Sequence, residues 1–149
     1  RAGAASRFSS RRLGRILALS SPLAESPKET ELRLLIHQIT SDLGATLLEQ
    51  VPVYKNGQVG ATGTRDDGAE LLTIIDIADV PRMIAFMYDG EHHLDRAQRD
   101  LDARITAELT RRGWLVIRVS AGMLRDTKEI TRQIRESFLA RAEFSRMVG

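Results

Sequence analysis

The sequence lacks cysteine altogether. This absence excludes disulfides, thiolate zinc sites and a cysteine nucleophile, and it fits the reducing cytoplasm, where we expect the protein to reside. Long apolar runs are missing too, because Asp76, Asp79 and Arg118 interrupt the longest candidates before the roughly 20 residues that a membrane-spanning helix needs. Residues 1–20 contain no uninterrupted apolar stretch of the kind found in signal peptides. We therefore expect no membrane partner.

Three common catalytic signatures are also absent: a glycine-rich phosphate-binding loop, a Gly-x-Ser-x-Gly elbow and a His-Glu-x-x-His helix. What the chain does contain is 42% hydrophobic and 28% charged residues over 149 positions, which is typical of one globular domain with its own core.

The charge is divided unevenly along the chain. Residues 1–27 hold five arginines and one acid, residues 28–110 hold eight bases and fifteen acids, and residues 111–149 hold nine bases and four acids. The acidic centre could hold a hard divalent cation, and the basic flanks could bind the phosphates of a nucleic acid. Alternatively, these charge blocks are the solvated faces of helices.

The chain begins with Arg1 rather than Met, which favours a fragment of a longer protein. Residues 4–19 mix arginines with leucines and isoleucine in the pattern of a basic amphipathic helix. Serines and prolines follow this stretch and mark a break. We predict that residues 1–25 are a basic helical linker and that residues 26–149 form the domain.

The periodicity of the apolar residues predicts a helix, three or four strands, a helix, a strand and a last helix. The first helix begins where Ser26 and Glu29 have the spacing of a capping box. A second helix is expected to end before Gly113. The predicted bounds are Pro27–Leu43 for the first helix, Ala45–Tyr54, Leu71–Ile77, Met83–Tyr88 and Trp114–Ser120 for the strands, and about Arg141 for the end of the last helix. This order predicts an α/β fold with a right-handed crossover between its last two strands.

Two aspartates are the main candidates for a metal site. Asp76 interrupts an apolar strand, where an ionised carboxylate must be exposed, paired or bound to a metal. Asp89 follows thirteen residues later, the distance that a tight connection and an antiparallel strand need for both acids to meet at one end of the sheet. Two carboxylates with backbone oxygens suit Mg²⁺, which can generate a hydroxide for attack on a phosphodiester. Alternatively, Asp89 serves a turn with Gly90, and Asp76 caps or pairs locally.

Glu29, His93 and Arg118 each have a catalytic and a structural interpretation. Glu29 could add a third carboxylate to the site, or it could serve only the capping box. His93 could act as an acid, a base or a ligand, or it could be an ordinary surface histidine. Arg118 could bind a phosphate, pair with Asp89, or face solvent from its strand.

Five motifs occur in the chain in this order: Ser26-Pro27-Lys28-Glu29-Thr30-Glu31-Leu32-Arg33, Gln50-Val51-Pro52-Val53, Ile75-Asp76-Ile77-Ala78, Tyr88-Asp89-Gly90-Glu91-His92-His93 and Gly113-Trp114-Leu115-Val116-Ile117-Arg118-Val119. Together they resemble an actinobacterial domain family akin to the very-short-patch repair endonucleases, over roughly residues 26–139. The resemblance implies the restriction-endonuclease-like PD-(D/E)XK fold, with an αβββαβ core and a mixed central sheet flanked by helices. It also implies Mg²⁺-dependent DNA cleavage or a relic of it, and a preceding winged-helix-like segment.

Position by position, the resemblance implies that Asp76 is the metal-binding acid and that Glu29 is the helical acid. Asp89 stands in the slot usually held by lysine. His93 corresponds to the histidine after the Asp-Gly turn, and Arg118 corresponds to the arginine of the following strand.

One residue departs from the family pattern. Met87 stands where the family usually has Glu, and a thioether does not bind Mg²⁺. Either the metal site is impaired, or it works without that Glu and uses the backbone carbonyl of Tyr88 as a ligand.

The leading hypothesis is therefore a Mg²⁺-dependent DNA endonuclease in which Asp76 holds the metal, Glu29 and Asp89 position its water, and His93 or Arg118 assists at the phosphate. The alternative is a catalytically inactive DNA-binding or protein-interaction module of a toxin-antitoxin or defence-type protein. A plain structural partner for the preceding segment is a third possibility.

Overall fold

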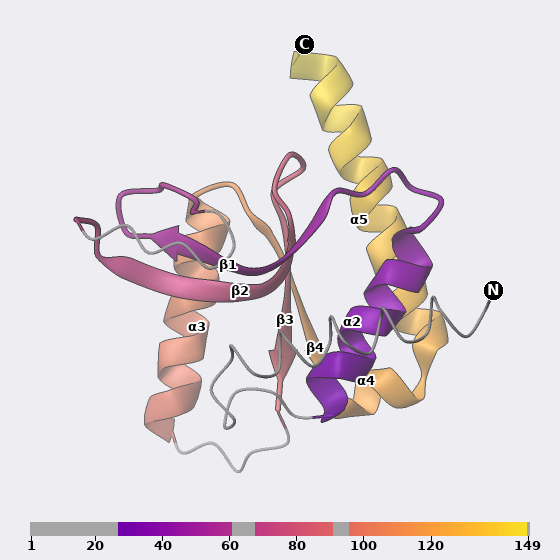
Figure 1. Cartoon of the computed structure of the whole chain (residues 1–149), viewed down its shortest axis with the longest axis horizontal. Coiled ribbons are helices and arrows are strands. Elements are labelled where there is room, and N and C mark those ends of the chain that lie inside the picture. The colour runs from indigo at the N-terminus through magenta and orange to yellow at the C-terminus, as the bar shows by residue number, and fades with distance from the viewer. Residues whose placement is uncertain (1–26, 61–67, 91–95, 149) are drawn as a thin grey trace, which may run out of the picture.

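The computed structural model describes residues 27–60, 68–90 and 96–148. Within them the elements follow the order α2 (Pro27–Thr40), β1 (Leu47–Tyr54), β2 (Leu71–Asp79), β3 (Ile84–Asp89), α3 (Arg96–Arg111), β4 (Leu115–Ser120), α4 (Ala121–Arg125) and α5 (Thr127–Val148), as Figure 1 shows. The predicted α/β class and the αβββαβ order are confirmed.

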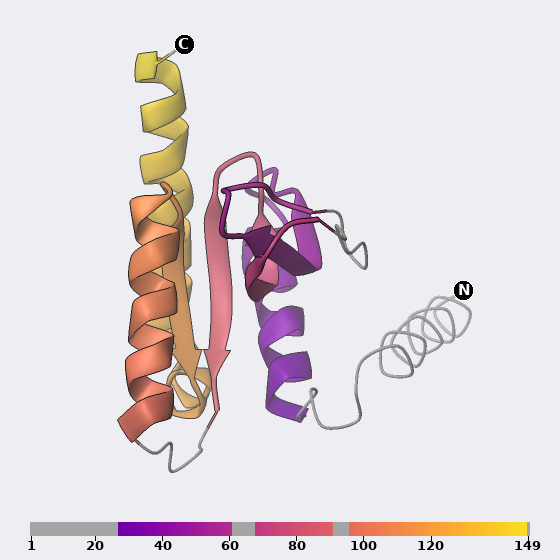
Figure 2. The ribbon, with the colours of Figure 1, turned by 90° about the vertical axis from the view of Figure 1, so that its left-hand side faces the viewer.

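The four strands form one mixed sheet in the order β1-β2-β3-β4. The β1–β2 and β2–β3 pairs are antiparallel, whereas β3 and β4 are parallel and are joined through α3. The prediction of a crossover between the last two strands is therefore confirmed. Helix α3 covers one face of β3 and β4, and α2, α4 and α5 lie on the other face (Figures 1 and 2).

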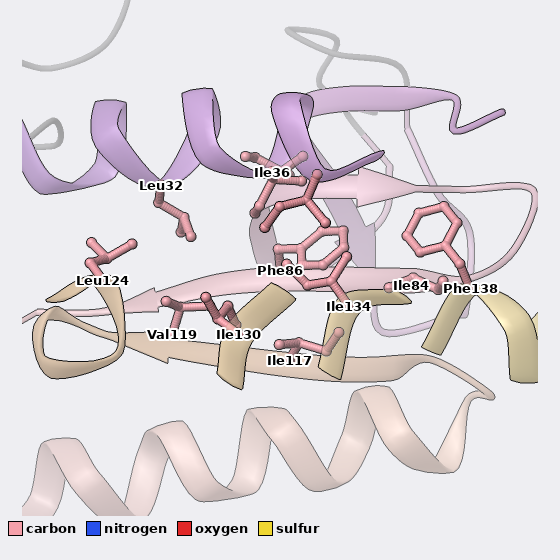
Figure 3. Packing of buried hydrophobic residues seen from close by; sticks show 12 residues of the cluster. Leu32, Ile36, Ile84, Phe86, Ile117, Val119, Leu124, Ile130, Ile134 and Phe138 are labelled. Atoms are coloured by element: carbon pink, nitrogen blue, oxygen red, sulfur yellow. The ribbon is translucent and has the colours of Figure 1, made fainter. Parts of the chain in front are cut away.

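The main core lies between the sheet and the helices α2, α4 and α5. Leu32, Ile36 and Ile39 follow the helical period along α2, and all three side chains are buried. Figure 3 shows side chains of α2 and α5 converging on Phe86 of β3. The buried members of this main cluster are Leu32, Ile36, Ile39, Ile77, Ile84, Phe86, Ile117, Val119, Leu124, Ile130, Ile134 and Phe138.

A second cluster fills the α3 side of the sheet. Its buried members are Val51, Val53, Ile75, Ala78, Ala85, Met87, Leu109 and Trp114. Residues two apart on a strand normally face the same side of a sheet. Ile75 nevertheless belongs to this second cluster, whereas Ile77 belongs to the main one. The strand therefore turns over at Asp76.

Strand β1 turns over at the matching position. Leu47 packs against the main cluster, whereas Val51 is buried in the second one. Gln50, between them, has a left-handed φ of 51°. We call Gln50 and Asp76 the elbow of the β1–β2 ribbon, which sweeps away from the line of β3 and β4 in Figure 1.

The bounds of two helices differ from the sequence prediction. Helix α2 ends at Thr40 rather than Leu43, because the chain turns towards Gly44, whose φ is 64°. Helix α5 continues to Val148, well beyond Arg141, because the apolar period of Ile130, Ile134 and Phe138 that set the predicted end stops before the helix does. The short helix α4 was not predicted, although the Ser120 side chain caps it by accepting a hydrogen bond from the Met123 N–H at 3.3 Å.

Candidate metal and phosphodiester site

Asp76 lies at the point where β2 stops pairing with β3. The ladder between these strands ends at the pair of Ile77 and Phe86. Beyond it, the Tyr88 N–H of β3 donates to Asp76 Oδ2 at 2.8 Å. The Gln50 side chain lies near the same carboxylate and lowers its pKa through hydrogen bonding. The Asp76 side chain therefore accepts a hydrogen bond from β3 that a backbone carbonyl of β2 would otherwise accept. Residues of both neighbouring strands, β1 and β3, interact with it.

Burial raises the pKa of Asp76 above its ordinary value of 3.8. The hydrogen bonds from Tyr88 and Gln50, and the charges of Arg33 and Arg118, act in the opposite direction without cancelling the effect of burial. The ionised carboxylate is thus poorly solvated where it lies. A cation bound to it would offset this desolvation.

Asp89, the last residue of β3, is paired with Arg118 of β4. The same guanidinium donates from Nε to Thr106 Oγ1 at 2.8 Å and from Nη2 to the Asp102 carbonyl at 3.3 Å. All three nitrogens of Arg118 are therefore engaged, and the side chain ties the ends of β3 and β4 to α3. Pairing with Asp89 was one of the three roles that the sequence left open for Arg118.

Arg118 also connects the two acids. It pairs with Asp89, and its charge lowers the pKa of Asp76 against the effect of burial. Arg118 is thus the residue through which the two aspartates are linked electrostatically, and their expected approach to one another stays a prediction. Their places along the strands differ from expectation, because Asp76 lies inside β2, which continues to Asp79 rather than ending at Ile77.

Glu29 lies in the first turn of α2 and is half-buried. Helix α2 begins on the side of the molecule where β3 ends (Figures 1 and 2). Ser26, its expected capping partner, and His93 lie outside the described residues, so their predicted roles stay predictions.

Met87 is buried, with 8% of its surface exposed, in the second cluster. It is the register partner of Arg118 in the parallel ladder. The position at which the resembled family has Glu is therefore filled by a core side chain opposite Arg118 in the ladder. A carboxylate there would have to leave the apolar cluster or pair with that arginine.

Arg33 and Gln50 act on Asp76, and neither they nor the polar residues that contact Arg33 were predicted as part of a site. Arg33 of α2 is buried, and its Nη1 lies 4.0 Å from the Glu49 carboxylate. His37 Nε2 lies 3.7 Å from the same carboxylate. Gln50 is part of the Gln50-Val51-Pro52-Val53 motif, which contributed to the family resemblance but was not assigned to the site. The sequence did hold a signal for Gln50, because a polar residue in front of a buried strand needs a hydrogen-bonding partner.

Mg²⁺ takes oxygen ligands, which carboxylates supply. Within residues 27–60, 68–90 and 96–148, no three His, Asp or Glu side chains are grouped to hold a metal ion. Glu29, Asp76 and Asp89 therefore do not form the expected three-acid cluster. Mg²⁺ keeps several waters and often uses only one or two carboxylates, so the half-buried Asp76 oxygens fit it as a principal ligand. A role for the Tyr88 carbonyl as a second ligand stays a prediction.

Comparison of the chain with family models, curated proteins and solved structures finds no match. Among the helices of the described part of the chain, none is long and apolar enough to cross a membrane.

Proposed function

We propose that this chain is an endonuclease-like domain that hydrolyses DNA phosphodiesters with the help of Mg²⁺ bound at Asp76. The observation that carries the proposal is the setting of Asp76: a half-buried carboxylate fixed by the Tyr88 N–H and Gln50, in the field of Arg118. A carboxylate held in this way is ready to receive a hard cation without rearrangement.

The surroundings of Asp76 support a phosphate substrate. Helices α2 and α3 both begin on the side where β3 ends (Figure 2). Their N-terminal N–H groups therefore favour an anion on that side of the sheet. Mg²⁺, when bound, would supply a water of lowered pKa and polarise the phosphodiester.

The chain's own residues have distinct roles in this proposal. Asp76 holds the cation. Asp89, fixed by Arg118, lies where it can orient water by hydrogen bonding. Arg118 is a positioning residue rather than a phosphate ligand, because its guanidinium is already bound to Asp89, Thr106 and Asp102.

One observation favours a second candidate, a DNA-binding domain that does not cleave. Met87 occupies the position of the usual Glu and is buried among apolar side chains. The resemblance implies an acid at this position, and Met87 cannot replace it as a ligand of Mg²⁺. This candidate predicts DNA binding that weakens with salt, by about 0.9 in the log–log slope for each neutralised phosphate, and no cleavage with Mg²⁺ or Mn²⁺.

The test is cleavage of supercoiled plasmid by the full chain with Mg²⁺ or Mn²⁺. The Asp76→Asn variant is the informative change, because the amide oxygen can still accept the Tyr88 N–H while the charge is lost. We expect metal-dependent nicking by the parent and a loss of at least about 100-fold in the variant.

The matched control is Asp42→Asn. Asp42 is exposed and paired with Arg135 on α5, so the same chemical change there should leave nicking intact. Nicking that survives Asp76→Asn unchanged would reject Asp76 as the metal ligand. Salt-sensitive DNA binding without any nicking by the parent would favour the second candidate.

A further inference from the structure

Gln50 has an unusual backbone conformation for its position. Its φ of 51° is left-handed, and in the described part of the chain Met83 is the other non-glycine residue with positive φ. Glycine adopts this region freely, whereas glutamine is strained in it. The position lies inside a strand rather than in a turn, so the strain is not explained by a change of chain direction between two elements.

Gln50, the strained residue, lies opposite Asp76, the proposed metal ligand. The register of β1 and β2 places Gln50 between the pairs Glu49–Ile77 and Val51–Ile75, and hence opposite Asp76. From this position the Gln50 side chain acts on the Asp76 carboxylate and lowers its pKa through hydrogen bonding.

Glycine would satisfy the backbone of the elbow with less strain but would supply no donor. Strained residues persist where their surroundings require the side chain, and such residues concentrate at functional sites. We infer that Gln50 is a positioning residue that orients the Asp76 carboxylate for a divalent cation. This inference rests on the proposed function and assigns Gln50 no contact with DNA.

The hydrogen-bond capacity of the carboxylate agrees with this role. An ionised carboxylate offers about four lone-pair directions. The Tyr88 N–H of β3 occupies one of them at 2.8 Å, and the Gln50 side chain of β1 acts on the carboxylate through hydrogen bonding as well. The carboxylate then cannot rotate freely, and its remaining lone pairs keep a fixed direction for the cation. Partners of metal ligands in this position typically change metal affinity or activity by about 10- to 100-fold when removed.

The test compares the full-length parent with Gln50→Gly and Gln50→Asn. Gln50→Gly relieves the backbone strain and removes the donor, so we expect an unchanged or higher unfolding temperature. The kcat for plasmid cleavage should fall by about 10- to 100-fold with unchanged KM for DNA. Gln50→Asn keeps an amide and tolerates a left-handed φ, so it should recover part of the lost rate.

Two further measurements do not depend on cleavage. Mn²⁺ titrated into the protein in a calorimeter should bind Gln50→Gly about 10-fold more weakly than the parent. Hydrogen exchange of the Tyr88 amide, observed by NMR in the metal-free protein, should be faster in Gln50→Gly because its acceptor is no longer held. The control is Met83→Gly, the same change at the other left-handed residue, in the turn before β3. It should leave Mn²⁺ affinity and kcat at the parental level.

The outcomes separate the two proposals. Parental kcat, Mn²⁺ affinity and Tyr88 exchange in Gln50→Gly would overturn the role of Gln50 and leave the proposed function standing. A parent that neither binds Mn²⁺ nor cleaves DNA would overturn the proposed function, and with it the role of Gln50 towards a cation. Equal losses in Gln50→Gly and Met83→Gly would show a general effect of glycine and would also overturn the inference.

Discussion

At the scale of single residues, Asp76 combines a structural and a candidate chemical role. Its side chain accepts a hydrogen bond from the Tyr88 N–H, which lies beyond the end of the β2–β3 ladder. It is also the carboxylate on which the proposed metal site depends. The structural role needs an oxygen acceptor, whereas the chemical role needs the negative charge. The two roles can therefore be separated by replacing the carboxylate with an amide.

The pKa of Asp76 gives a prediction for stability against pH. Because burial raises this pKa in the folded state, the fold holds the proton more tightly than the unfolded chain does. The parent therefore loses stability through Asp76 as the pH rises from 3.8 through the raised pKa. Asp76→Asn carries no such charge and should be more stable than the parent at pH 7, with the difference vanishing near pH 3.

Urea unfolding of both proteins between pH 3 and pH 7 measures this difference. An Asp76→Asn protein that is less stable than the parent at pH 7 would mean that Arg33 and Arg118 stabilise the charged carboxylate more than burial destabilises it.

At the scale of elements, Asp79 and Arg82 join three parts of the chain. Asp79 is fully buried and accepts hydrogen bonds from the Thr46 N–H at 3.0 Å, the Arg82 N–H at 3.0 Å and Arg82 Nη1 at 2.9 Å. Arg82 also donates to the Gly44 carbonyl at 3.2 Å, and its guanidinium carbon lies 5.3 Å from the centre of the Phe138 ring. The β2–β3 turn is thereby fixed to the α2–β1 connection and to α5.

Removing one partner of this network should lower the free energy of unfolding. Asp79→Ala leaves the Thr46 N–H and the partly buried Arg82 without their acceptor, so we expect a loss of about 3 kcal/mol in the free energy of unfolding. The control is Arg135→Ala, which breaks the exposed pair with Asp42 and should cost at most about 1 kcal/mol. Equal losses, measured by chemical denaturation, would contradict a special role for the buried pair.

At the scale of the whole molecule, the sheet separates two apolar clusters that lie under different helices. Among the described residues, Phe86 is the largest fully buried side chain, and it belongs to the main cluster between α2 and α5. Its strand, β3, also leads to Asp89. The packing that stabilises the fold therefore also fixes the end of the strand that carries the candidate site.

Phe86→Ala should lower the free energy of unfolding by about 3–5 kcal/mol, because it opens a cavity in the main cluster. Leu139, which is 61% exposed on α5, provides the comparison, and Leu139→Ala should change stability by no more than about 0.5 kcal/mol. A small effect of Phe86→Ala would show that the main cluster can close around the gap.

Much of the fold follows from local pattern. The helical period of Leu32, Ile36 and Ile39 predicted α2, and the short apolar runs predicted all four strands. Helix ends were less accurate, because the exposed residues after Phe138 carry no apolar periodicity although the helix continues. For the site, the sequence identified Asp76 as a charged residue inside an apolar strand. The motif alone could not reveal that Gln50 is its neighbour.

The sequence by itself determined the α/β class, the order of the elements and the position of Asp76 within a strand. These features depend on the spacing of apolar and polar residues within single helices and strands. Only the tertiary structure decided that the β1–β2 ribbon turns over at Gln50, that Tyr88 and Gln50 both bind Asp76, and that Arg118 engages Asp89 rather than remaining available for a phosphate. These contacts join residues from 12 to 29 positions apart, and the twist of the sheet that brings them together has no local signature.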